Sequence, residues 1–398
     1  MGRKSVNSSR GFSLVELLVS LAVGTLVVGS AVKLFTQGMN ATFVVSQRAQ
    51  MQQDLRASSN LMIKDISLAG AGLPPGAGIA LPSGGTRPIY GYAPSCLAKN
   101  NCAPGNGIAY PCSSIAGPCL PTLYGLIPGY RLGITVPGSP LPSDVITVVY
   151  SDTVFALPCY TVTAITNTTI TLQLPAVLPG SCILTPPLVA PQPVTGGPVS
   201  LTPGDVILVQ STTAGGNSAS AIAEVTAVAA NGGGNYTVTC NVGDTLNLNQ
   251  PGAPGDLSQL DSAAPPASAT ATRIFVISYY LWMMPDPLGV GAGTPTLMRQ
   301  VNGQTPAPVQ EGVPDLQFTY DTYDSSGNLL NASGDGGYST GTSFNLIRKI
   351  NLVHLTTRTQ ISGARSGLMT TNGYQTFDTQ TSISARNLSY QNRYILGP

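Results

Sequence analysis

Glu16 is the residue of this sequence best placed to do chemistry, because it lies near the start of a long apolar stretch. The stretch covers residues 12–35 and directly follows Gly11. An ionisable group inside an apolar segment of this length is costly in a membrane, so a carboxylate there indicates function by default. Two interpretations stay open: the carboxylate has a functional role, or it reaches the membrane interface and has no further role.

The apolar stretch is long enough to span a membrane. It contains 24 residues. As a helix these would extend about 36 Å, because an α-helix rises about 1.5 Å per residue, and a hydrocarbon core is about 30 Å thick. The leader before it carries Arg3, Lys4 and Arg10 and no acid. Basic flanks stay in the cytoplasm, so the body should lie on the far side. An ordinary secretory signal is disfavoured, because no small-x-small cleavage site ends the stretch.

The segment Gly11-Phe12-Ser13-Leu14-Val15-Glu16 resembles the processing site of type IV prepilins and of type II secretion pseudopilins. The resemblance implies that prepilin peptidase cuts between Gly11 and Phe12, that Phe12 is then N-methylated, and that Glu16 promotes assembly. An unpaired carboxylate in a filament core would be destabilising, whereas pairing with the Phe12 amine of a neighbouring subunit would compensate it. The implied partners are other pilins and minor pilins, prepilin peptidase, the inner membrane and the pilus assembly machinery.

Helical signals continue beyond the apolar stretch. The first proline is Pro74, and between residues 44 and 69 apolar side chains recur with helical spacing. These side chains are Val44, Met51, Leu55, Met62, Ile66 and Ala69. The pattern predicts one helix from Phe12 to Ala69 whose second half packs on a head, and Gly70 should end it.

Composition divides the chain into a leader at 1–11, a transmembrane or filament-core helix at 12–35, an amphipathic continuation at 36–72 and a head at 73–398. Within the head, residues 76–140 are predicted to form a Cys-, Gly- and Pro-rich loop region. Three glycines interrupt the helix and indicate close approach between helices, local melting of the helix, or ordinary membrane-helix composition. They are Gly24, Gly29 and Gly38.

Segments rich in β-branched residues, separated by turn residues, predict a mainly antiparallel head. They are 144–150, 160–165, 169–174, 204–210, 221–228, 236–240, 274–282, 316–323 and 347–357. Residues 231–234 and 325–328 have the composition of hairpin connections. The predicted fold class is therefore α+β, in which a long N-terminal helix packs on a β-rich head with long Gly/Pro-rich loops.

Four head segments resemble the PilW-type minor pilins: GDVILV at 204–209, VISYYL at 276–281, VQEGVPDLQFTY at 309–320 and SARNL at 384–388. The resemblance implies a minor pilin that takes part in initiating or assembling a type IV pilus and has no catalytic activity of its own. J-type pseudopilins of type II secretion share these motifs and are the first alternative. A membrane-anchored surface adhesin, whose loops bind a ligand, is the second.

Seven cysteines together with an export signal favour structural disulfides in an oxidising compartment. No Cys-x-x-Cys occurs, which argues against zinc ribbons and thioredoxin-like centres. The spacing predicts two loop staples and a third pair that clamps a hairpin, and it leaves Cys240 over. The candidates are Cys96 with Cys102, Cys112 with Cys119, and Cys159 with Cys182.

The remaining polar clusters give weaker signals. Asp321, Asp324 and Asp335 surround a glycine-containing loop and are weak calcium candidates, although hairpin turns often have this composition. The single histidine, His354, lies in an alternating strand and is predicted to be structural. Only 9% of residues are charged and the formal net charge is +1, so no nucleic-acid partner is expected. Apart from calcium, no cofactor is expected.

Overall fold

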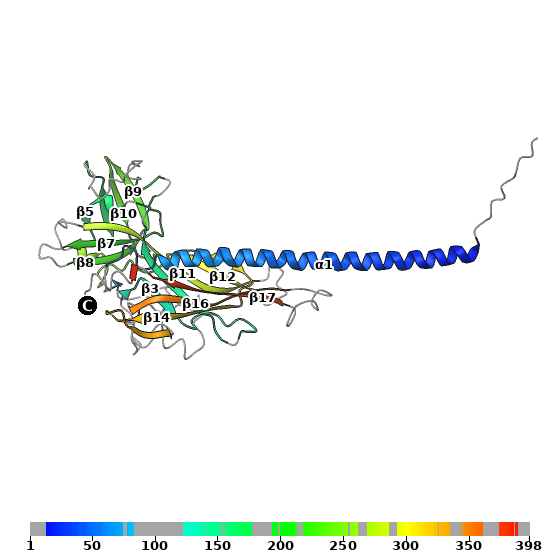
Figure 1. Cartoon of the computed structure of the whole chain (residues 1–398). Coiled ribbons are helices and arrows are strands. Elements are labelled where there is room, and N and C mark those ends of the chain that lie inside the picture. Colours follow the sequence, from blue (N-terminus) through cyan, green and yellow to red (C-terminus); the bar gives the residue numbers. More distant parts are fainter. Residues whose placement is uncertain are drawn as a thin grey trace, which may run out of the picture. The chain divides into compact units, whose positions relative to one another are not determined.

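A computed structural model of the chain contains one long helix and a β-rich head (Figure 1). The chain divides into two compact units, an N-terminal unit of residues 1–53 with 359–375 and a head unit of residues 54–358 with 376–398. The structure describes residues 13–74, 78–82, 122–139, 141–152, 154–155, 157–176, 193–197, 200–212, 218–253, 255–261, 269–285, 293–324, 326–334, 344, 346–360, 374–385 and 387–388.

Helix α1 covers Leu14–Ser67, which confirms the predicted long helix. At about 1.5 Å per residue it is about 81 Å long. It ends before Gly70, whose φ of 78° is a left-handed conformation that favours glycine. A Cβ added at Gly70 would lie 2.6 Å from Cδ2 of Leu388, so a side chain at this position would require Leu388 to shift. The Gly70 N–H donates to the Val149 carbonyl at 2.8 Å, which fixes the chain where it leaves the helix.

The apolar positions predicted to face a head are all buried. In the head unit they belong to the larger of two hydrophobic clusters, and three of them, Met62, Ile66 and Ala69, have no exposed surface. Fully burying such side chains contributes about 1.5–3 kcal/mol each for the larger ones. The sheet therefore holds the last turns of α1 mainly through apolar contact.

A seven-stranded sheet forms the centre of the head. Its strand order is β13-β12-β11-β4-β3, and β7 pairs with both β11 and β8. The strands are β3 (Leu126–Gly129), β4 (Val145–Ser151), β7 (Val206–Thr212), β8 (Ser218–Glu224), β11 (Ala269–Met284), β12 (Thr294–Val301) and β13 (Ala307–Glu311). Strand β11 pairs with β7 over 269–274, with β4 over 274–279 and with β12 over 277–284. It therefore extends through both parts of the head core.

A four-stranded sheet of order β5-β6-β10-β9 covers the second hydrophobic cluster. Its strands are β5 (Thr161–Ile165), β6 (Thr169–Gln173), β9 (Ala227–Gly232) and β10 (Asn235–Thr239). Alternate side chains such as Ile170, Leu172 and Val238 point inward, as the two-residue period of a strand requires. The short elements η1 (Leu157–Cys159) and α3 (Ser258–Asp261) add residues to the same cluster.

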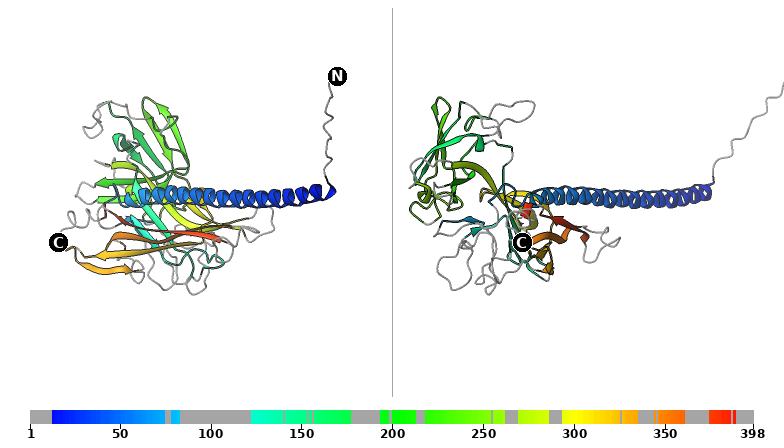
Figure 2. Two further views of the ribbon diagram at one scale, coloured as in Figure 1. Left: turned by 45° about the vertical axis from the view of Figure 1, so that its right-hand side comes forward. Right: turned by 60° about the vertical axis from the view of Figure 1, so that its left-hand side comes forward.

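A third sheet has the order β15-β14-β16-β17. Its strands are β14 (Asp315–Tyr323), β15 (Leu329–Gly334), β16 (Ile347–Gln360) and β17 (Tyr374–Ser384), and a small pair joins β1 (Ile79–Ala80) to β2 (Thr122–Leu123). Figure 2 shows the orange and red strands of the third sheet apart from the green strands β7 to β10. The registered strand pairs of the described residues are antiparallel, which confirms the α+β class.

Two predictions about the head were wrong in detail. The region 76–140 is not purely loop, because β1, β2 and β3 lie within it. The predicted strand 221–228 is two strands, since β8 ends at Glu224 and β9 begins at Ala227. Between them the Val225 N–H bonds the Asp205 carbonyl and the Thr226 N–H bonds the Thr239 carbonyl, each at 2.8 Å, so the chain changes sheets there.

Candidate assembly site

The first residues of α1 form a hydrogen-bonded cap. The Ser13 N–H donates to Oε2 of Glu16 at 3.2 Å, and the Val15 N–H donates to Oγ of Ser13 at 3.3 Å. This is a capping box, in which a serine before the helix and a glutamate in its first turn satisfy backbone donors that the helix leaves free. The predicted cleavage residues Gly11 and Phe12 lie outside the described residues. Glu16 thus has a structural partner within its own chain.

The N-terminal part of α1 exposes its apolar side chains. Leu14, Leu26 and Phe35 are 70–75% exposed. The other large apolar side chains between Leu14 and Phe35 are also exposed, each by more than half. Among the described helices, α1 alone is long and apolar enough to cross a membrane, and its most apolar window has a mean hydropathy of 2.1. Within residues 14–35 the charged side chains are Glu16 and Lys33, one near each end. This pattern fits a single membrane-spanning helix with charges at both interfaces.

Hydroxyl side chains in the apolar segment bond to their own helix. Ser20, Thr25 and Ser30 each donate to the carbonyl three residues earlier, at 2.8–2.9 Å. Such bonds satisfy a polar group that would otherwise be costly in an apolar environment. The hydroxyls therefore allow the segment to be buried in lipid or against other helices.

The three predicted helix interruptions do not break α1. Gly24, Gly29 and Gly38 are helical, and a Cβ at any of them would meet no atom within 4 Å. Gly38 also lines a groove of about 850 Å³ along the N-terminal unit, together with small and apolar residues such as Ala31 and Phe43. Small residues let a second helix approach closely, so these positions suit helix packing.

The last turns of α1 carry a buried carboxylate, Asp65. One of its oxygens accepts from the Tyr279 hydroxyl at 2.7 Å and from Nε of Arg299 at 2.8 Å. The other accepts from the Tyr150 hydroxyl at 3.2 Å. Burial and the Asp65 charge raise the pKa of both tyrosines, so the hydroxyls stay protonated and donate. An acid near a helix C-terminus is unfavourable, and these donors from β4, β11 and β12 compensate it.

A second helix contact lies about two turns earlier on the same face of α1, at Ser58. The Ser58 hydroxyl is buried and bonds both the Leu55 carbonyl and the side chain of Gln310 on β13. Asp65 and Ser58 thus attach α1 to four neighbouring strands of the central sheet, β4, β11, β12 and β13. Polar contacts of this kind fix the rotation and axial position of the helix, which apolar packing alone specifies less strictly.

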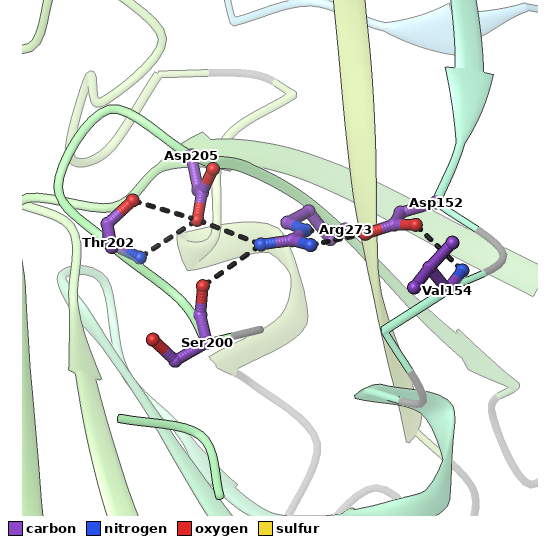
Figure 3. A network of polar contacts seen from close by, with 6 residues as sticks. All are labelled: Asp152, Val154, Ser200, Thr202, Asp205 and Arg273. Carbon is purple, nitrogen blue, oxygen red and sulfur yellow. Dashed lines mark hydrogen bonds and ion pairs between the residues drawn. The ribbon is translucent and has the colours of Figure 1, made fainter. Parts of the chain in front are cut away.

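Arg273 on β11 is the centre of another buried network (Figure 3). Its guanidinium forms ion pairs with Asp152 and, at 3.4 Å, with Asp205, and its Nη1 donates to the Ser200 carbonyl at 3.0 Å. It also lies 4.8 Å from the ring centre of Phe155. The partners come from the end of β4 and the turn before β7, so Arg273 joins the two strands that flank β11 at this point. Its donors are satisfied by these partners, which indicates a structural role.

The calcium candidates are used by the protein's own donors. Asp321 accepts from the Ser333 N–H at 2.8 Å and pairs with Lys349 at 3.3 Å. Asp324 accepts from the backbone and side chain of Asn328 in the hairpin turn. Among the described residues no cluster of three potential metal ligands occurs, and Asp335 lies outside them. The contacts of Asp321 and Asp324 are therefore those of structural residues of the β14–β15 hairpin.

The described cysteines are Cys159 and Cys240. Cys240 is buried and free, as predicted for the unpaired thiol, and burial raises its pKa to about 12. Cys159 is disulfide-bonded, and its predicted partner Cys182 lies outside the described residues. The four candidates Cys96, Cys102, Cys112 and Cys119 also lie outside them.

His354 lies beside an acid on the neighbouring strand. Its Nδ1 is 2.9 Å from Oδ2 of Asp378, and the Thr356 hydroxyl donates to the other oxygen of that carboxylate. This cross-strand pair joins β16 to β17 and agrees with the structural role predicted for the histidine.

Comparison with known proteins identifies the N-terminal segment. A family model described as the prokaryotic N-terminal methylation motif matches residues 6–32. No curated protein and no solved structure matches the chain. The chain therefore carries a prepilin-type N-terminus, and this motif with the exposed apolar start of α1 fits a membrane-anchored, type IV pilin-like protein. Such a motif supports a type IV pilin or pseudopilin that prepilin peptidase would process.

Proposed function

We propose that this chain is a minor pilin that takes part in initiating or assembling a type IV pilus. The observation that supports the proposal most is the methylation motif at 6–32, joined directly to an exposed, capped apolar helix. Prepilin peptidase would cut between Gly11 and Phe12, Phe12 would be methylated, and residues 12–35 would anchor the subunit in the inner membrane before entering the filament. The β-rich head would then lie outside the cytoplasm and has no catalytic role.

Glu16 has two roles in this proposal. In the single chain it caps α1, and in the filament its carboxylate pairs with the Phe12 amine of a neighbouring subunit. An ion pair inside an apolar core is stable only if both charges are compensated, so the pair would set the axial register. The head segments at 204–209, 276–281, 309–320 and 384–388 support a PilW-type subunit.

The test is mass spectrometry of the N-terminus of the protein purified from membranes and from sheared filaments. The expected mature chain begins at N-methylated Phe12. An intact Met1 in both fractions, or cleavage within the apolar segment, would contradict the proposal. Peptide mapping without reduction in the same experiment checks the predicted Cys159–Cys182 pair.

The first alternative is a J-type pseudopilin, because the methylation motif is equally suited to both classes. Deletion of the gene separates the two. Loss of surface pili and twitching supports the minor pilin, whereas normal pili with an intracellular build-up of a secreted enzyme supports the pseudopilin. The second alternative, a surface adhesin, predicts that filaments persist and attachment alone is lost.

A further inference from the structure

Asp144 is a buried carboxylate that connects two sheets of the head. It precedes β4 and is 1% exposed. Its Oδ1 accepts from the Arg131 N–H at 2.6 Å, in the turn after β3, and its Oδ2 accepts from the Phe318 N–H of β14 at 2.7 Å. The Asp144 N–H donates to the Leu316 carbonyl at 2.8 Å. One residue therefore bonds to β14 twice and to the β3–β4 turn once.

These bonds join elements that belong to different sheets. Strands β3 and β4 belong to the seven-stranded sheet, and β14 belongs to the sheet β15-β14-β16-β17. A neighbouring contact strengthens the connection, because Nε2 of Gln317 donates to the Pro142 carbonyl at 3.0 Å. We call this set of contacts, made by Pro142 and Asp144 with Leu316–Phe318, the intersheet joint.

The charges around Asp144 leave its carboxylate poorly compensated. Burial raises the pKa of Asp144 to about 7, although the two N–H donors act in the opposite direction. Arg131 is the nearby cation, from the same turn, and Asp315 on β14 is a like charge that raises the pKa further. Tyr320, also on β14, is fully buried, and the Asp144 charge helps to raise the pKa of its hydroxyl. The Tyr320 hydroxyl has no hydrogen-bond partner among the described residues, so it does not stabilise the charge.

We propose that the intersheet joint is proton-controlled: it is closed when Asp144 is protonated and opens more often when Asp144 is charged. A protonated carboxyl has no buried charge and still accepts fully through its carbonyl oxygen, while its hydroxyl oxygen accepts more weakly from the second N–H group. The ionised group keeps the same bonds but is stabilised by opening, because opening exposes it to water. A head outside the cytoplasm experiences the pH of its surroundings, so its rigidity would follow that pH.

The sign and range of the effect follow from linkage. The pKa of Asp144 in the closed joint is about 7, and in an open, solvated joint it returns towards 3.8. The extra stability of the closed joint is therefore fully present below about pH 4 and is lost as the pH rises to about 7. Within that range opening should increase by up to about tenfold per pH unit.

The test is hydrogen exchange of the full-length protein in detergent, measured by mass spectrometry and corrected for the intrinsic rate at each pH. Peptides that cover β14 should exchange faster as the pH rises from 4 to 7, and those that cover β6 should show no such trend. In Asp144→Asn the trend at β14 should disappear. A control, Asp256→Asn, removes another buried acid that accepts from the Gly252 and Ser258 N–H groups and should keep the trend.

A second variant keeps the proposal testable if Asp144→Asn does not fold. Asp315→Asn removes the like charge and keeps an amide oxygen that can still accept from Nε2 of Gln317, so the pKa of Asp144 should fall and the trend should end at a lower pH. A wild-type β14 that exchanges equally at all pH values would overturn the proposal. The proposal would also be overturned if Asp315→Asn kept the pH range of the exchange trend at β14. It would be overturned as well if the trend persisted in Asp144→Asn.

Discussion

Oδ2 of Asp65 on α1 lies 2.8 Å from Nε of Arg299 on β12. Because the same oxygen also accepts from Tyr279, one carboxylate attaches the helix to two adjacent strands. The Asp65 side chain is only 4% exposed, so water cannot replace these donors. The contact therefore determines where along the sheet the helix is held.

Replacing Asp65 by asparagine should lower the free energy of unfolding of the head. Breaking a buried pair by removing one partner costs about 3–5 kcal/mol, and we expect about 3 kcal/mol because Arg299 is partly exposed. Urea denaturation followed by fluorescence of Trp282, the only tryptophan of the chain, measures the effect. Asp54→Asn on an exposed face of the same helix is the matched control and should change stability little.

Glu16→Gln should separate the two roles of Glu16. Glutamine can still cap the helix, so membrane insertion and processing should stay normal. It has no charge to pair with the Phe12 amine, so incorporation into filaments should fall at least tenfold. Quantitative immunoblots of membrane and sheared fractions measure both. Wild-type incorporation of this variant would show that capping is the whole role of Glu16.

Arg273→Met should destabilise the head by about 3–5 kcal/mol, because it leaves the buried Asp152 and the partly buried Asp205 without a cation. The side chains of Arg273 and Asp152 are 11% and 5% exposed, so solvent screening is small. Arg56→Met, on an exposed part of α1, controls for loss of a positive charge. Equal midpoints of urea denaturation for the two variants would contradict the structural role of Arg273.

Gly70→Ala should cost more stability than Gly243→Ala. Both glycines have positive φ, 78° and 92°, so alanine is strained at each by about 1 kcal/mol or more. Only at Gly70 would the new Cβ meet another atom, 2.6 Å from Leu388, because Gly243 has open space. Thermal unfolding of the two variants isolates the steric part. Similar melting temperatures would mean that Leu388 moves aside at no cost.

The sequence predicted the helix well because its signals are local and redundant. The spacing of Met62, Ile66 and Ala69 identified the buried face of α1. Gly70, after the last turn, identified where the helix ends. The two predicted hairpin connections also have local signals, and both hairpins occur. One turn contains Gly233 and Gly234 and joins β9 to β10, and the other precedes β15 and joins it to β14.

Other elements could not be read from the sequence because their neighbours determine them. Strand β3 is a buried apolar run among Gly- and Pro-rich residues, and pairing with β4 makes it a strand. Strand β12 contains Pro295 and the polar pair Arg299 and Gln300, which conceal its alternation. The capping box was missed although its signal is local: serine followed three residues later by glutamate, before an apolar run. Asp65 gave no signal, because its partners are 85 to 234 residues away.

The shared strand β11 has a consequence for how the head melts. The larger hydrophobic cluster packs against the part of β11 that pairs with β4 and β12. The second cluster packs against the part of β11 that pairs with β7. Neither cluster can lose its strand without disturbing the other, and Arg273 closes the junction between them. Heating should therefore produce a single calorimetric transition in the head, with both cores lost together.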